Sequence, residues 1–180
     1  RSRGLGDVYK RQMAFHMCNR FHAEYHVFDI ITDLLSNGRS SRFIQTLVQE
    51  KKLFTSIDAY ISGSLDEGLL HITGKPASGI TLEQAEEAVW QELDKLKTIP
   101  VAEEELEKVK NRYESEQIFN NINYLNVATN LAFFELLGHA EDINLEVGKY
   151  RSVTVGQIQD TACRTFIPEN CNILYYKAIK

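Results

Sequence analysis

The chain has 180 residues and a formal net charge of −5, with 43% of its residues hydrophobic and 25% charged. This composition predicts a folded domain with a sizeable core, and it disfavours nucleic acid or an anionic membrane as a partner. No apolar run approaches the roughly 20 residues of a membrane-spanning helix, so we also expect no membrane partner.

The first segment, residues 1–11, reads RSRGLGDVYKR and has no hydrophobic periodicity. We interpret it as a cloning scar, a sequencing artefact or a linker, and a short basic arm is the functional alternative. We therefore expect one domain over residues 12–180. No secretory signal with a charged head and an apolar core is present, and we expect a cytoplasmic location, with the periplasm as the alternative.

Residues 12–18 alternate in the manner of a strand, and residues 24–36 then show helical periodicity. The expected buried face of this helix consists of Val27, Phe28, Ile30, Ile31, Leu34 and Leu35.

The next stretch, residues 37–60, predicts a helix end, a second helix and a strand. Gly38 suits the left-handed position after a helix, and Ser40 or Ser41 can cap the next helix. The apolar face of that helix is expected to comprise Phe43, Ile44, Leu47 and Val48. From Leu53 the period becomes two, which places Thr55 on the same face of the strand as Ile57 and Ala59.

The remaining elements follow from turn and cap signals. Residues 53–74 predict a β-hairpin, and Thr81 opens a capping box for a helix that ends near Thr98. A long acidic helix follows Pro100, with a break expected at residues 117–123, where asparagines cluster. The apolar face of this long helix is predicted to continue, after a shift in phase, on Ile118, Ile122, Leu125, Thr129, Ala132 and Leu136.

Two helices and a strand complete the chain. A short helix is expected at residues 143–150, and Thr154 begins a second capping box. The inward face of the helix that follows is Ile158, Ala162 and Phe166, and residues 171–178 alternate as a last strand. Strands and helices without regular alternation predict an α+β fold, a mostly antiparallel four-stranded sheet with helices packed on one face.

Two groups of residues are candidates for a metal site. His22 and His26 are four residues apart and could share a helix face that binds zinc, but Glu24 between them would point away from both imidazoles. We therefore expect a solvated helix start there and no metal in this chain. The three cysteines lack metal-site spacing, so buried free thiols are expected, with a Cys163–Cys171 disulfide as the open alternative.

A resemblance supplies the functional expectation. The run GRSSRFIQ at residues 38–45 leads into a strand that ends in Ala59 and Tyr60. This order is similar to the C-terminal half of the insulinase/pitrilysin family of zinc peptidases, which includes the mitochondrial processing peptidase. The likeness extends more loosely from about Met13 to Tyr176. It implies the LuxS/processing-peptidase-like metallohydrolase fold, as in the processing-peptidase-like bacterial members.

The same resemblance implies that zinc belongs to a partner half that carries an H-x-x-E-H helix, a motif that this sequence lacks. Active members use an arginine and a tyrosine of this half to reach the substrate. The corresponding positions here are Val48 and Thr55, and neither side chain can do the same work. The nearest hydrogen-bond donors, and hence the expected substrate-binding residues, are Thr55, Gln49 and Lys52, and no catalytic residue is expected.

We expect the zinc-free half of a metallopeptidase that closes over an N-terminal zinc-bearing half, or a homologous subunit, around an unfolded peptide. The chain alone is expected to be inactive and to associate with itself through an exposed apolar face. One alternative is a non-catalytic, core-like binding or assembly subunit of the same fold. A third hypothesis is an independent metal enzyme that uses His22 and His26.

Overall fold

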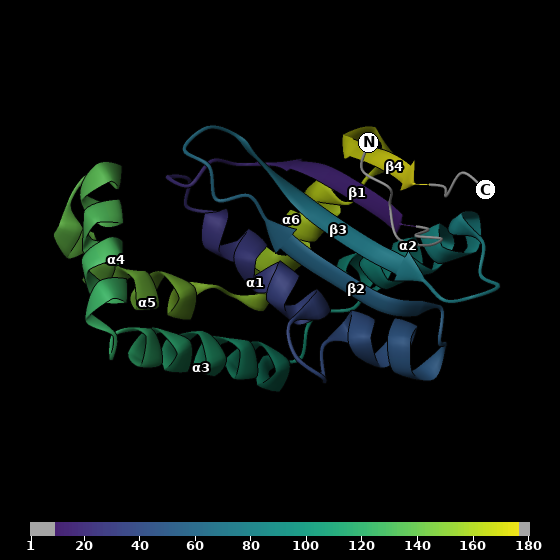
Figure 1. The fold of residues 1–180 in the computed structure, drawn as a ribbon, viewed down its shortest axis with the longest axis horizontal. Coiled ribbons are helices and arrows are strands. Elements are labelled where there is room, and N and C mark those ends of the chain that lie inside the picture. Colours follow the sequence, from purple (N-terminus) through teal and green to yellow (C-terminus); the bar gives the residue numbers. More distant parts are fainter. Residues whose placement is uncertain (1–9, 177–180) are drawn as a thin grey trace, which may run out of the picture.

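The computed structural model describes residues 10–176. Four strands within this range form an antiparallel sheet in the order β2-β3-β1-β4 (Figure 1). The strands are β1 (Lys10–Met17), β2 (Phe54–Ile61), β3 (Gly68–Pro76) and β4 (Cys171–Tyr176). The predicted α+β class and the β2–β3 hairpin are therefore confirmed.

The first strand begins two residues earlier than the sequence pattern indicated, since the backbones of Lys10 and Arg11 pair with Tyr176 and Gly74. Residues 1–9 of the expected linker, and residues 177–178 of the expected last strand, lie outside the described residues.

Three helices cover one face of the sheet, as predicted: α1 (Tyr25–Ser36), α2 (Leu82–Thr98) and α6 (Val155–Thr165) (Figure 1). Their apolar faces are buried, and both predicted capping boxes, at Thr81 and Thr154, are present. The ring of Phe15 on β1 meets Trp90 of α2 and Phe166 after α6 edge-on, with centroid distances of 5.7 Å and 5.1 Å. This aromatic contact joins the sheet to the helix layer.

The helix that follows α1 is a π-helix, η1 (Ile44–Glu50); its Leu47, and Phe43 directly before it, are buried in the core. Gly38 has a φ of 94°, as the sequence predicted for a position that closes α1. The predicted serine cap was wrong, because the Ser41 hydroxyl donates a hydrogen bond to the Gly38 carbonyl instead of accepting one from a helix N–H. Ser40 instead lies against the Lys108 ammonium group.

The face assigned to the start of β2 was also wrong. A bulge between Phe54 and Ser56 shifts the register, so Phe54 is buried and Thr55 is exposed. Ile57 and Ala59 point inward as predicted.

The remaining helices form an arm beside the sheet: α3 (Glu103–Asn120), α4 (Tyr124–Leu137), the 3-10 turn η2 (Ala140–Asp142) and α5 (Ile143–Ser152) (Figure 1). A last 3-10 turn, η3 (Pro168–Asn170), precedes β4. The predicted break between α3 and α4 is confirmed. The stripe expected to continue the buried face is exposed instead, since Leu125 and Leu136 are 72% and 71% accessible. Within residues 10–176, no helix has the length and apolar character needed to cross a membrane.

Candidate functional site

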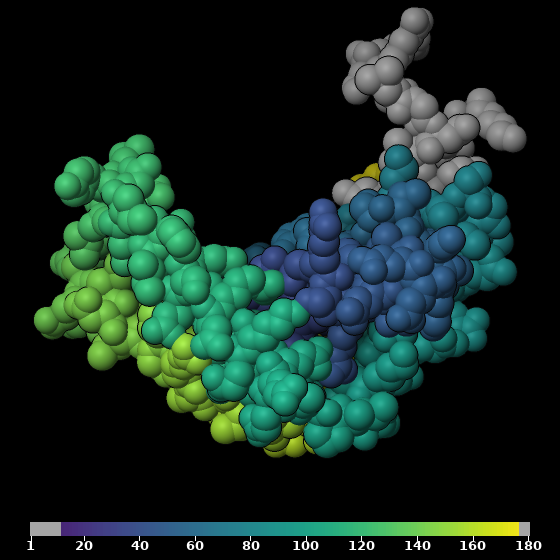
Figure 2. All heavy atoms as spheres, turned by 90° about the horizontal axis from the view of Figure 1, so that it is seen from below, coloured from purple at the N-terminus to yellow at the C-terminus, as the bar shows by residue number. Residues whose placement is uncertain are grey.

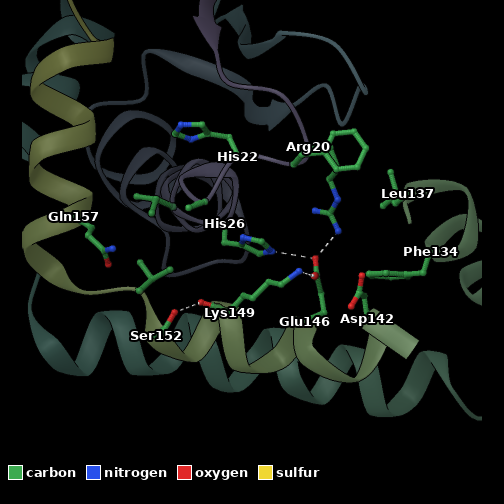
Figure 3. Close-up of a pocket in the computed structure, with 14 residues that line it drawn as sticks. Arg20, His22, His26, Phe134, Leu137, Asp142, Glu146, Lys149, Ser152 and Gln157 are labelled. Carbon is green, nitrogen blue, oxygen red and sulfur yellow. Dashed lines mark hydrogen bonds and ion pairs between the residues drawn. The ribbon is translucent and has the colours of Figure 1, made fainter. Parts of the chain in front are cut away.

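A cavity of about 340 Å³ lies where the start of α1, the end of α4 and α5 meet (Figure 3). Its polar floor is formed by Arg20, His26, Glu146 and Lys149 (Figure 3). Apolar side chains also line it, namely Phe21, Ala23, Val27, Phe134, Leu137 and Val153. Pockets with a few convergent polar groups inside an apolar lining are the usual form of a binding site.

Glu146 is the centre of the polar floor, and three cationic or hydrogen-bonding groups converge on it (Figure 3). Nε2 of His26 lies 3.1 Å from Oε1 of Glu146, and the Arg20 guanidinium pairs with the same oxygen. Nζ of Lys149 lies 3.3 Å from the other oxygen, Oε2. The side chains of His26 and Glu146 are each 7% exposed, so this contact is shielded from water.

The pKa of Glu146 is lowered by this environment. Burial alone would raise the pKa, but the hydrogen bond from His26 and the positive charge of Arg20 outweigh it and hold the pKa at about 2. Glu146 is therefore a carboxylate at neutral pH and a poor proton acceptor. Its role in this cavity is to neutralise cations, which is a structural role.

A second polar contact joins the same helices next to the cavity. The Tyr150 hydroxyl of α5 donates a hydrogen bond to the Asp29 carboxylate of α1, and the Tyr113 ring of α3 stacks on Tyr150 with centroids 3.5 Å apart. Burial raises the pKa of Asp29 and also the pKa of Tyr150. These contacts anchor α3 and α5, and through them the arm, on α1.

Cavity chemistry therefore favours binding over catalysis. Its lining sets the cations Arg20 and Lys149 against two carboxylates, Glu146 and Asp142, while the Phe21 side chain that also lines it is 61% exposed. Such a site can hold an apolar side chain of a peptide or of a partner domain. Among the residues that the structure describes, no group of three or more His, Cys, Asp or Glu side chains could hold a metal ion.

The structure separates the three predicted substrate-binding residues. Thr55 lines a surface hollow formed with residues 75–83, whereas Gln49 and Lys52 do not line it. The Thr55 hydroxyl donates to the Lys75 carbonyl at 3.0 Å, and the Gln49 amide lies 3.4 Å from the Arg39 carbonyl. Lys52 is exposed with a φ of 52°, the left-handed conformation of a residue that ends a helix. Their role in substrate binding stays a prediction.

The other candidate positions also have definite places. Val48 is half-buried against the core, and His22 is exposed before α1. His26 is buried and bound to Glu146, so the expectation that both histidines belong to a solvated helix start was wrong for His26. The expectation of three buried thiols was wrong, because Cys163 is exposed and Cys18 and Cys171 are only partly buried; all three cysteines are free.

Reasoning from the sequence missed Glu146, Arg20 and Tyr150 as members of one polar cluster. His26 and Glu146 are 120 residues apart, and no local spacing connects them. The sequence offers one indirect indication of this contact. In the pattern H-x-E-x-H, neither histidine has a nearby carboxylate on its own helix face.

Comparison with known proteins places the chain in a family. The family model described as the peptidase M16 inactive domain matches residues 10–113. A search of curated proteins finds no match.

Solved structures share the fold over nearly the whole chain. A protease from Helicobacter pylori is 19% identical with a TM-score of 0.89, and the match covers 95% of this chain and 41% of that one. An inactive peptidase domain from Bordetella parapertussis is 18% identical with a TM-score of 0.87, covering 99% of this chain and 95% of that one. Pitrilysin is 15% identical with a TM-score of 0.73, and the match covers 96% of this chain but only 19% of pitrilysin. Because the family model spans more than half of the sequence, the chain belongs to the peptidase M16 inactive-domain family.

Proposed function

We propose that this domain is the zinc-free half of a zinc metallopeptidase and forms one wall of a chamber that encloses an unfolded peptide. The opposite wall is a half that bears H-x-x-E-H and zinc, where the glutamate activates a metal-bound water. The present half contributes shape, closure and hydrogen bonds to the peptide. Thr55, Gln49 and Lys52 are the donors that we assign to the peptide-facing surface.

The observation that carries this proposal is the family match at residues 10–113 to a domain described as inactive. The Bordetella parapertussis domain comes from a protein assigned as a zinc protease. The chain spans 41% of the Helicobacter pylori protease, which leaves room in such proteins for a second half of similar size.

The alternative is a core-like binding or assembly subunit that handles peptides without cutting them. Val48 favours it, because this position, where active members carry a reaching arginine, is held by an apolar side chain packed against the core. An H-x-x-E-H motif about 150 or more residues upstream in the parent reading frame, a typical domain length away, favours the peptidase.

The test measures zinc content and cleavage of an unstructured fluorogenic peptide by the purified chain without added metal. We expect neither stoichiometric zinc nor cleavage. Zinc-dependent hydrolysis that a chelator abolishes would overturn the assignment of this half as metal-free and would revive the hypothesis of a metal enzyme based on His22 and His26.

A further inference from the structure

An uncharged segment occupies the tip of the arm. Nine of the fourteen residues from 103 to 116 are charged, whereas residues 117–134 contain no Asp, Glu, Lys, Arg or His. This segment covers the end of α3, the break and most of α4. A solvent-exposed helix normally carries charges on its outer face, so an uncharged and apolar helix is expected to be covered.

Among residues 10–176, only one side of α4 is covered by other parts of the chain. Val127, Asn130, Phe134 and Leu137 are the residues of α4 that are at least partly shielded, at the spacing of one helix face, and they lie on the side of η2 and α5. The opposite side of α4 presents exposed residues that, with Ile118 at the end of α3 and Ile122 in the break, we define as the arm stripe: Ile118, Ile122, Leu125, Thr129, Ala132 and Leu136. Figure 2 shows that α4, in green, stands away from the body of the molecule.

The arm stripe and its neighbours expose enough apolar surface for a stable protein interface. Seven large apolar side chains of the segment, together with Leu136 just beyond it, are 40–91% exposed, namely Ile118, Phe119, Ile122, Tyr124, Leu125, Leu131, Phe133 and Leu136. If a large side chain offers about 200 Å², together they present on the order of 1,000 Å². A standard interface buries about 800 Å² on each partner.

We propose that the arm stripe is a homodimerisation surface, on which α4 of one copy packs against α4 of a second copy about a twofold axis. In such an interface the same patch must complement itself. An uncharged stripe meets this condition, since no like charges are brought together, whereas the rest of a chain with net charge −5 repels its copy.

The chemistry of the segment disfavours other occupants. Helices that bind membrane surfaces carry Lys and Arg on their polar face, and residues 117–134 have neither. The absence of charge is typical of the core of a permanent interface. The arm lies to one side of the sheet (Figure 1).

Sedimentation velocity on the purified chain tests the proposal. We expect a species of twice the 20.6 kDa of one chain at tens of micromolar, and the double variant Leu125→Glu, Leu136→Glu should weaken pairing by about tenfold or more. Leu65→Glu is the matched control, because Leu65 is also exposed but lies in the turn between β2 and β3. It should pair as the wild type does.

Circular dichroism verifies that each variant is folded, and Ala132→Arg is a second disruptive variant at an exposed position of the same stripe. A wild-type chain that stays monomeric would overturn the proposal. Dimers that persist in both disruptive variants would also overturn it, because the interface would then lie elsewhere. A monomer that floats with phosphatidylcholine vesicles would instead assign the stripe to a membrane surface.

Discussion

Nε2 of His26 on α1 lies 3.1 Å from Oε1 of Glu146 on α5, although 120 residues separate them. Arg20 pairs with the same carboxylate. This buried cluster joins the arm to the helix layer that supports the sheet, so its removal should be felt in the stability of the whole domain.

Glu146→Gln should lower the free energy of unfolding by about 3 kcal/mol, because it leaves the Arg20 guanidinium without its buried counter-charge. Urea denaturation at pH 7 measures the change. Glu87→Gln is the matched control, since Glu87 is an exposed glutamate on α2, and it should change stability by less than about 0.5 kcal/mol. Equal effects of the two variants would contradict a structural role for the Glu146 cluster.

The stability that Glu146 contributes should depend on pH. Burial opposes ionisation, but His26 and Arg20 lower the pKa of Glu146 from 4.5 to about 2. The contribution is therefore fully present above about pH 4.5 and is lost as the pH falls towards 2. Unfolding free energies of the wild type and Glu146→Gln should converge over this range. A difference that stays constant between about pH 5 and pH 3 would show that the charge of Glu146 is not the source.

Ser36→Ala should weaken the free edge of β2. The Ser36 hydroxyl accepts a hydrogen bond from the Ala59 N–H at 2.9 Å and lies 3.1 Å from the Ala59 carbonyl. Its loss leaves these edge groups unpaired and should cost about 1–3 kcal/mol. Hydrogen exchange of the Ala59 amide should accelerate, while Ser115→Ala, at an exposed helical serine, should change neither quantity. Unaltered exchange at Ala59 would refute the edge contact.

Two glycine-to-alanine substitutions should have opposite effects on the stability of the domain. A Cβ at Gly74 on β3 would lie 2.5 Å from Cε1 of the buried Phe54 ring, and Gly74→Ala should destabilise the domain by about 1–3 kcal/mol. A Cβ at Gly148 on α5 meets nothing within 4 Å, so Gly148→Ala should stabilise the helix by about 0.5–1 kcal/mol. Thermal unfolding of both variants measures the signs, and destabilisation by Gly148→Ala would contradict the open space above α5.

Local patterns predicted most elements, because each has its own period and cap. The faces of α1 and α6, and the capping boxes at Thr81 and Thr154, depend only on neighbours in sequence. Thr55 was placed on the wrong face because a bulge adds one residue to β2, and alternation cannot reveal where that residue is inserted.

The site was less predictable than the fold. An apolar stripe indicates that a helix face needs a cover, but it does not say whether the cover belongs to the same chain, and the arm stripe lies outside this domain's own core. The cavity depends on His26 meeting Glu146, a contact between distant segments that no motif encodes. A burial pattern alone therefore identifies α4 as apolar without identifying its partner.

The position of β1 in the sheet has a consequence for how the chain is made. β1 lies between β3 and β4, and its pairing with β4 joins Lys10 to Tyr176. During synthesis, one edge of β1 must therefore stay open until almost all of the described residues have left the ribosome. Closing so long a loop is slow, and an unpaired central strand is prone to aggregate. Chains interrupted before Cys171 should depend on chaperones far more than the complete domain does.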